Sequence, residues 1–406
     1  METSRGSRAD LHCRSTASQV SRLGVQRALG LPECATPPEE VHELVPAPPL
    51  RVVDVALFHG PRTGGIRTYL EAKARWAAAA PAGAIEHHVV VPGRRERHEG
   101  GRHELRALPL PAADGYRLLV GVHALERTVA ELQPDVVLLH DPFWRPHRVV
   151  ATAHAAGARV VAVHHGSGAP GAAGMPGPAR LWLPLARAWM RRAYARVDAV
   201  MAAVDPRPDC GRRADLRLRR GVDPAFRPRP GVPRGDETVY AGRLAREKGI
   251  LTLLQAAARS GEDWPLWIVG SGPQLRAIRS RAHRLGLGER LRLEPFVADP
   301  GALARIYARA RCVVVPGEHE RFGLVALEAA CSGARVVTCA TAPAARAIGD
   351  RVCDTFLPGD AEGLADAIAA ARSAPRDRRA AADLAARHGW SGVFTAELER
   401  LRELAR

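Results

Sequence analysis

The sequence predicts an α/β protein with two Rossmann-like domains that face a common cleft. Its 406 residues exceed what one hydrophobic core usually organises, which favours two domains. Short apolar runs alternate with helical stretches, and this alternation predicts parallel sheets covered by helices. The alternation stops in the proline-rich segment at residues 221–230 and starts again at residues 237–240. Because open α/β sheets bind ligands at the carboxyl ends of their strands, we expect the ligand in the cleft between the domains.

The first alternating series follows residues 1–49, a polar stretch that ends in prolines and predicts a loose N-terminal extension. A buried strand is expected at residues 51–58, followed by a turn at 59–65 and then a helix. Further elements complete an N-terminal domain over residues 50–222. They are strands at 86–91, 135–140, 159–164 and 199–204, and a helix at 121–132.

The second series predicts a C-terminal domain over residues 223–385, which the proline-rich linker separates from the first. Residues 386–406 form a further terminal segment. The strands of this domain are expected at 266–269, 290–293, 312–315 and 335–338, with helices between them.

The composition narrows the classes of partner. A net charge of +16 suits nucleic acid, an anionic membrane or a phosphorylated substrate. The arginines are scattered and no helix-turn-helix, zinc-finger or RNA-binding signature is present, so nucleic acid is not expected as a partner. Seven cysteines without a C-x-x-C pair suit a reducing compartment. The sequence has no membrane-spanning apolar run and no secretory pattern, so we expect a cytoplasmic protein.

One helical stretch leaves peripheral contact with the inner face of a membrane open. Residues 179–197 carry Trp182, Trp189 and several arginines, a pattern found in helices that lie on a membrane surface. The same stretch precedes a strand, as a crossover helix does. Leu, Ala and Trp at helical spacing are typical of packing against a core, so we favour packing.

The chain holds only two lysines, Lys73 and Lys248, among 59 basic residues. Lys248 stands five residues after Arg243, in the turn between an expected strand and the next helix. An ammonium on a flexible stem binds phosphate as a compact point charge. Two cations on one strand-end turn can neutralise a diphosphate without a metal, whereas the alternative is a cluster of surface charges.

Two carboxylates, Glu320 and Glu328, are separated by seven residues after the apolar strand at 312–315. If a helix begins near Phe322, these carboxylates lie about 12 Å apart along its axis. They are then too far apart to share one reacting atom and are expected to hold different parts of an extended ligand. The backbone N–H groups of Phe322, Gly323 and Leu324 would face an anion. The alternative is two glutamates on a solvated surface.

These segments resemble the GT-B glycosyltransferases of family 4, a retaining group that uses nucleotide-sugar donors. The resemblance covers about residues 51–406 and rests on several ordered motifs. They are the Gly64-Gly65 loop, His164-His165-Gly166 after an apolar strand, Gly221-Val222-Asp223, the turn with Arg243 and Lys248, the glycine-rich turn at 267–273, and the pair Glu320 and Glu328. The last stretch, from His388 to Arg406, resembles the C-terminal helix of the family, which crosses back onto the first domain.

The resemblance implies a donor site in the C-terminal domain. Arg243 and Lys248 would bind the donor diphosphate and stabilise the departing charge. Glu320 would contact hydroxyls of the transferred sugar, and the following amides would approach the sugar and the phosphate. Glu328 would bind the ribose hydroxyls.

The N-terminal domain would complete the site and bind the acceptor. Gly64 and Gly65 would let their loop approach the donor phosphate. His165, or less favourably His164, would lie beside the anomeric carbon, as an acid, a hydrogen-bond donor or a packed ring. Acceptor contacts are expected from Arg67 and Asp141, whose alternatives are ordinary helix-surface and turn roles.

The activity implied by the resemblance is retaining transfer of a hexose from a UDP- or GDP-linked donor to a hydroxyl of a lipid, a glycan or a small metabolite. No Asp-x-Asp motif is present, so neither a metal nor a cofactor is expected. A nucleotide-sugar epimerase of the same shape is one alternative. A second is a degenerate member without activity, a basic protein that binds a membrane or a partner enzyme.

The sequence departs from the family pattern at three places. Arg321 occupies a position where proline is frequent, and Arg220 one where asparagine often precedes Gly-Val-Asp. The segment from Thr338 to Arg346 lacks the paired glycines and the following acid that are common in relatives. The changes at Arg321 and in the segment from Thr338 to Arg346 concern the surroundings of the donor and motivate the non-catalytic alternative.

Overall fold

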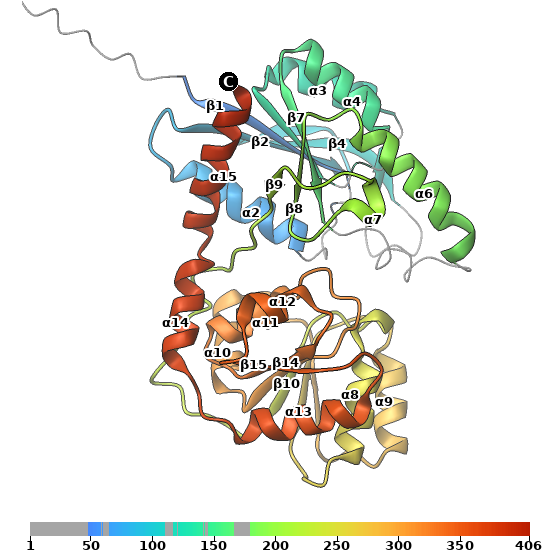
Figure 1. Ribbon diagram of the computed structural model, residues 1–406, viewed down its shortest axis with the longest axis vertical. Helices are drawn as coiled ribbons and strands as arrows, with labels where there is room; N and C mark the ends of the chain where they lie inside the picture. Colours follow the sequence, from blue (N-terminus) through green and yellow to red (C-terminus); the bar gives the residue numbers. More distant parts are fainter. Residues whose placement is uncertain are drawn as a thin grey trace, which may run out of the picture. The chain divides into compact units, whose positions relative to one another are not determined.

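The protein is represented by a computed structural model (Figure 1) that describes residues 48–57, 59, 65–109, 117–119, 121–140, 142, 145–165 and 179–406, without the side chains of residues 179–183 and 186. The chain divides into two units, residues 1–46 and 47–406, and every described element belongs to the second. The expected N-terminal extension lies outside the described residues, apart from residues 48–49.

The first sheet is formed by the N-terminal half of the described chain, and its strand order is β3-β4-β2-β1-β6-β7-β8-β9. Its strands are β1 (Leu50–Ala56), β2 (Ile85–Gly93), β3 (Arg97–Glu99), β4 (Arg102–Pro109), β5 (Arg117–Leu119), β6 (Val136–His140), β7 (Arg159–His164), β8 (Ala199–Ala202) and β9 (Leu216–Arg217). From β4 to β9 along this order the neighbours are parallel, while β3 and β5 pair antiparallel with β4. Strands of a parallel sheet are buried on both faces and therefore consist of continuous apolar runs. The parallel part of this sheet is formed where such runs predict it.

Helices cover both faces of this sheet, each with its own apolar core. They are α2 (Gly65–Ala78), α3 (His123–Leu132), α4 (Pro146–Ala155), α6 (Ala179–Tyr194) and the short α7 (Arg207–Cys210). Helix α6 buries Met190, Ala193 and Tyr194 in one core, so the packing favoured for this stretch is confirmed. Its outer side exposes Leu185 at 74% and Trp189 at 40%.

The second sheet is parallel throughout, with the strand order β12-β11-β10-β13-β14-β15. Its strands are β10 (Thr238–Ala241), β11 (Leu266–Val269), β12 (Leu291–Glu294), β13 (Cys312–Val315), β14 (Val336–Cys339) and β15 (Cys353–Phe356). The order reverses between β10 and β13. In doubly wound sheets this switch point opens a crevice beyond the carboxyl ends of the strands, where ligands bind.

Helices flank both faces of the second sheet and bury two further cores. They are the short 3₁₀ helix η1 (Arg246–Lys248), α8 (Ile250–Arg259), α9 (Leu275–Arg284), α10 (Pro300–Arg309), α11 (Leu324–Cys331), α12 (Pro343–Ile348) and α13 (Ala361–Ser373). Helix α11 contacts β13 and β14 on one side and the later helix α14 (Arg378–Arg387) on the other. It is the next element after β13, so the loop at the carboxyl end of β13 leads directly into it.

The chain ends in two helices that pack on different sheets. Helix α14 (Arg378–Arg387) contacts α11, and α15 (Trp390–Ala405) contacts α2 beside the first sheet (Figure 1). Trp390 and Phe394 of α15 pack edge-on against Tyr69 of α2, with ring centroids 6.1 and 5.4 Å from it. The expected return of the C-terminal helix to the first domain is thus confirmed. None of the described helices is long and apolar enough to cross a membrane.

Candidate active site

Two loops meet at the switch point of the second sheet. The first follows β10 and runs from Gly242 to Gly249, and the second follows β13 from Pro316 to Gly323. Gly249 has a φ of +66°, and a Cβ atom there would collide with the carbonyl oxygen of Pro316. Only a glycine tolerates both the positive φ and this close approach, so Gly249 allows the two loops to pack against each other.

This contact brings together two residues that the sequence predicts for the donor site. Lys248 Nζ lies 2.8 Å from Glu320 Oε1, and their side chains are 31% and 11% exposed. Arg243, at the start of the same loop, has a half-exposed guanidinium, with Nη1 4.0 Å from Glu247 Oε1. Its carbonyl oxygen accepts a hydrogen bond of 2.8 Å from the Tyr240 hydroxyl. Two cations, Arg243 and Lys248, therefore lie with the carboxylates of Glu247 and Glu320 at the carboxyl edge of β10 and β13.

Helix α11 begins at Leu324 rather than near Phe322, because Gly323 adopts a left-handed conformation with a φ of +94°. The amides of Phe322 and Gly323 consequently belong to the turn before the helix. Ala344 N donates a hydrogen bond of 2.8 Å to Phe322 O. The segment that departs from the family pattern thus packs directly behind the loop that carries Glu320.

Glu328 lies on α11, and burial, assisted by the negative charge of Asp223, raises its pKa to about 8. Burial and the Glu328 charge also raise the pKa of Tyr307 well above its usual value. A carboxyl group with such a pKa is largely protonated at neutral pH and gains its charge only when donors approach it. Hydroxyl groups of a ligand can supply those donors.

The glycine-rich turn after β11 has a packing role that the sequence did not indicate. A Cβ atom at Gly270 would collide with the carbonyl oxygen of Gly242, and one at Gly272 with that of Leu244. The glycines therefore let this turn pack against the loop that carries Arg243. The close approach that these glycines permit is made by the chain's own backbone.

The N-terminal half contributes Gly65, the first residue of α2. A Cβ atom there would lie 3.1 Å from Leu324 Cδ1 at the start of α11. Arg67 forms a helix-surface ion pair, with Nε 2.6 Å from Glu71 Oε1. Gly64 and Asp141 lie outside the described residues.

His165 follows β7 and is buried, with both ring nitrogens engaged. Nε2 lies 2.8 Å from His140 Nδ1, and the Arg220 guanidinium donates to Nδ1 over 3.2 Å. Burial, followed by the charge of Arg220, holds the pKa of His165 well below its usual range. His164 instead packs toward Tyr194, with Nδ1 3.0 Å from the Tyr194 hydroxyl oxygen.

Behind His165 lies a buried ionic cluster that sequence reasoning missed. Lys73, only 1% exposed, places Nζ 2.8 Å from Asp54 Oδ2 and 2.8 Å from Glu397 Oε1. His140 Nε2 lies 2.6 Å from Asp54 Oδ1. The available signal was Asp54 itself, because a carboxylate inside an apolar strand requires a buried partner.

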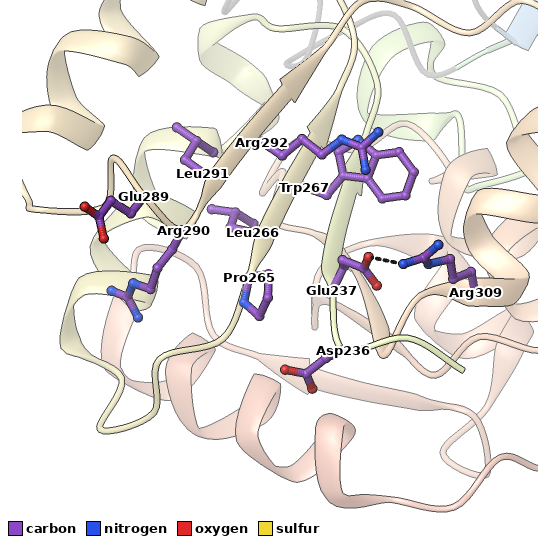
Figure 2. Close-up of a pocket in the computed structure, with 10 residues that line it drawn as sticks. All are labelled: Asp236, Glu237, Pro265, Leu266, Trp267, Glu289, Arg290, Leu291, Arg292 and Arg309. Carbon is purple, nitrogen blue, oxygen red and sulfur yellow. Dashed lines mark hydrogen bonds and ion pairs between the residues drawn. The ribbon is translucent and has the colours of Figure 1, made fainter. Parts of the chain in front are cut away.

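A separate pocket of about 390 Å³ lies at the amino ends of β10, β11 and β12 (Figure 2). Trp267 forms one wall, with the Arg292 guanidinium carbon 4.3 Å from its ring centroid, and Glu237 pairs with Arg309 over 2.8 Å. In a parallel sheet the amino ends lie at the edge opposite the carboxyl ends. This pocket is therefore distinct from the candidate donor site.

Two family descriptions match the two halves of the chain. The family "Glycosyltransferase Family 4" matches residues 63–204, and "Glycosyl transferases group 1" matches residues 225–388. The GDP-mannose-dependent alpha-(1-6)-phosphatidylinositol dimannoside mannosyltransferase of Mycobacterium tuberculosis is 31% identical over 322 residues, which is 72% of this chain and 80% of that protein. A D-inositol 3-phosphate glycosyltransferase of Arthrobacter sp. is 36% identical over 201 residues, 44% of this chain and 48% of that protein.

Solved structures show the same fold. Sucrose-phosphate synthase from Thermosynechococcus elongatus superposes with a TM-score of 0.68 and 20% identity, over 87% of this chain and 98% of that chain. The Anabaena protein HepE in complex with UDP and glucose superposes with a TM-score of 0.64 and 17% identity, over 87% and 100%. The fold and the matches to known families thus place the chain among the enzymes of the GT-B glycosyltransferase class. Within it, the chain belongs to the glycosyltransferases of family 4.

Proposed function

We propose that this enzyme transfers a hexose, with retention of configuration, from a nucleoside diphosphate sugar to a hydroxyl group of a lipid, a glycan or a small metabolite. The observation that carries the proposal is the contact between Lys248 and Glu320 at the switch point. In such a donor the diphosphate is bonded directly to the sugar. A cation for the phosphate beside a carboxylate for sugar hydroxyls matches that arrangement.

The donor site proposed here uses the C-terminal half of the chain, residues 223–385. Arg243 and Lys248 bind the diphosphate and stabilise the charge that develops as it departs, which is the main source of rate enhancement in this account. Glu320 and the amides of Phe322, Gly323 and Leu324 hold the sugar and the adjoining phosphate. The partly buried Glu328 accepts hydrogen bonds from the ribose hydroxyls.

The acceptor is assigned in this proposal to the N-terminal half, residues 50–222, completed by the terminal segment 386–406. Gly64 and Gly65 allow their loop to approach the donor phosphate, and His165 lies beside the anomeric carbon. Arg67 and Asp141 contact the acceptor. The positive charge of Arg67 favours an acceptor that carries an anionic group.

GDP-mannose is the first donor to test, because the mycobacterial relative is named for that donor. UDP-glucose is the comparison, because the HepE structure contains UDP and glucose. Phosphatidylinositol mannosides and inositol 3-phosphate are the first acceptors, on the same ground.

The test incubates purified full-length protein with each donor, with and without acceptor. Nucleoside diphosphate release and product configuration are measured by chromatography and NMR. The proposal expects release that depends on the acceptor and a product with the anomeric configuration of the donor. Conversion of the donor sugar without acceptor identifies an epimerase, and the absence of binding and turnover with all donors contradicts the proposal. Equal rates with and without EDTA test the expected independence from metal.

Peripheral membrane contact is a separate part of the proposal. Helix α6 exposes Leu185 and Trp189 together with Arg191 and Arg192. Apolar and cationic side chains on one helix suit an anionic membrane surface. Cosedimentation with vesicles that contain anionic lipid, compared with neutral vesicles, tests this contact, and equal recovery from both contradicts it.

A further inference from the structure

A continuous chain of buried polar side chains runs from Asp54 to Arg220 through two histidine rings. Asp54 Oδ1 lies 2.6 Å from His140 Nε2, and His140 Nδ1 lies 2.8 Å from His165 Nε2. The other nitrogen of His165 faces Arg220 Nη2 at 3.2 Å. The two rings are nearly parallel, with an interplanar angle of 14° and centroids 5.1 Å apart.

The residues at the two ends of this series, Asp54 and Arg220, have opposite hydrogen-bonding capacities. An ionised carboxylate only accepts hydrogen bonds, and a guanidinium only donates them. Arg220 therefore requires an unprotonated Nδ1 on His165. Asp54 requires a proton on Nε2 of His140, so that His140 Nδ1 must accept and His165 Nε2 must donate. One arrangement of protons satisfies every contact.

The anchors at both ends are themselves fixed. Lys73 and His87 hold the second oxygen of Asp54, at 2.8 and 2.7 Å. Burial would raise the pKa of Asp54, but Lys73, and after it His140 and His87, outweigh burial and keep it well below its usual value. At the other end, the carbonyl oxygen of Arg220 lies 2.9 Å from His388 Nδ1, just before α15.

We propose that Asp54 and Arg220 are positioning residues that lock His165 as a neutral ring with its proton on Nε2. An additional proton cannot be accommodated without placing two donors face to face. On His165 it would point at the Arg220 guanidinium, and on His140 it would oppose the Nε2 proton of His165. Burial and the nearby groups Arg220, His140, Arg321 and His164 each disfavour the imidazolium form of His165.

This inference rests on the proposed function, because it assigns a state to the histidine beside the transferred sugar. A neutral ring held at both nitrogens orients its surroundings but does not deliver a proton. In the transfer, the bond from the anomeric carbon to the diphosphate breaks and the bond to the acceptor oxygen forms. The acceptor proton then leaves with the diphosphate, whose charge Arg243 and Lys248 stabilise.

The test is an NMR measurement on the full-length protein with ¹⁵N-labelled histidine, in which signals are assigned by their loss in His140→Gln and His165→Gln. His165 is expected to be neutral between about pH 5 and about pH 8, and both rings are expected to carry a proton on Nε2. A proton on Nδ1 of either ring overturns the proposal. The proton positions are measured in the wild-type protein, and the two variants serve only to assign its signals.

Arg220 variants test the positioning role. Arg220→Met removes the donor, so His165 is expected to titrate, whereas Arg220→Lys keeps a donor-only group and the neutral ring. Arg219→Met, which removes an exposed neighbouring charge, is the matched control and should leave the His165 signals unchanged. Titration of His165 in Arg220→Lys but not in Arg220→Met overturns the assignment to Arg220.

Kinetics separates this inference from the proposed function. In Arg220→Met we expect kcat to fall on the order of tenfold or more, with a smaller change in the donor KM and a new loss of activity at low pH. If the wild-type protein has the expected tautomers but transfers no sugar, the neutral state of His165 is supported and the proposed function is contradicted. If the protein transfers sugar but has different tautomers, the assigned state of His165 is overturned and the proposed function stands.

Discussion

Lys248 and Glu320 form an ion pair of 2.8 Å although 72 residues separate them in the chain. The pair closes the gap between the loops after β10 and β13, at the point where the strand order reverses. A diphosphate that binds Lys248 therefore competes with a carboxylate that is already in place. Glu320 orders the cation and also weakens its attraction for phosphate.

The first prediction separates these two effects of Glu320. In Glu320→Gln, the affinity for free nucleoside diphosphate should increase severalfold, because removing the paired carboxylate is worth about 1 kcal/mol to a new anion at a partly exposed site. The transfer rate should fall, because the carboxylate is also proposed to hold the sugar. Calorimetry and steady-state kinetics measure the two quantities. Glu362→Gln, an exposed change on α13, should alter neither, and weaker diphosphate binding in Glu320→Gln would count against competition.

The second prediction concerns the pH dependence of nucleotide binding. The pKa of Glu328 is raised to about 8, and ribose hydroxyls that donate to the ionised carboxylate lower it again. Binding then releases a proton, so affinity should rise by up to about tenfold per pH unit toward pH 8 and level off above it. The measurement is the dissociation constant of the nucleoside diphosphate across this range. The rise should disappear in Glu328→Gln, and an unchanged slope in that variant would exclude Glu328 as its origin.

The third prediction addresses stability at the same residue. A carboxyl with a raised folded-state pKa is protonated in the native chain and ionised in the unfolded chain between about pH 4.5 and pH 8, so its stability cost grows as pH rises through this window. Glu328→Gln should therefore raise the free energy of unfolding at neutral pH by on the order of 2 kcal/mol. Urea unfolding at about pH 5 and pH 8 tests this. An equal effect at both pH values would refute the burial argument.

The fourth prediction concerns the ionic cluster of the first sheet. Lys73→Met should destabilise the protein by about 3–5 kcal/mol, because it leaves the Asp54 and Glu397 carboxylates buried without their cation. Arg75→Met, at a mostly exposed position of the same helix, should cost less than about 1 kcal/mol. Denaturant unfolding of both variants provides the comparison. Similar losses from the two changes would show that the cluster contributes little.

The fifth prediction concerns the contact between the two switch-point loops. Gly249→Ala should cost roughly 1–3 kcal/mol, since it adds strain at a positive φ and a collision with Pro316. Gly261→Ala, where a Cβ meets open space, is the control and should be nearly neutral. The free energies of unfolding and the donor KM are measured for both. If Gly249→Ala folds and keeps the wild-type donor KM, the contact between the two loops is not needed for donor binding.

The strands of both domains could be predicted from the sequence because apolar runs of four to six residues mark buried parallel strands. The predicted strands at 159–164, 266–269 and 312–315 coincide with β7, β11 and β13. The convergence of Lys248 and Glu320 also follows from the sequence, since both stand after strands whose carboxyl ends share one edge.

The features that could not be predicted from the sequence depend on contacts between elements that are far apart in the chain. The sequence assigns no role to Lys73, and only the fold shows that it pairs with Asp54 of β1 and Glu397 of α15. Helix α11 starts two residues later than expected because Gly323 takes a left-handed conformation, where an added Cβ would lie 3.0 Å from Ala344 Cβ. Neither effect leaves a local pattern.

The central claim is that the cations at the switch point bind the donor diphosphate during sugar transfer. The most direct test measures acceptor-dependent release of nucleoside diphosphate by the wild-type protein and by Lys248→Ala, with Arg246→Ala as the matched control in the same loop. The account predicts a loss of about a hundredfold or more in kcat for Lys248→Ala, the size seen when a group that stabilises developing charge is removed. Turnover that is unchanged in Lys248→Ala, and also after combination with Glu328→Ala, would contradict it.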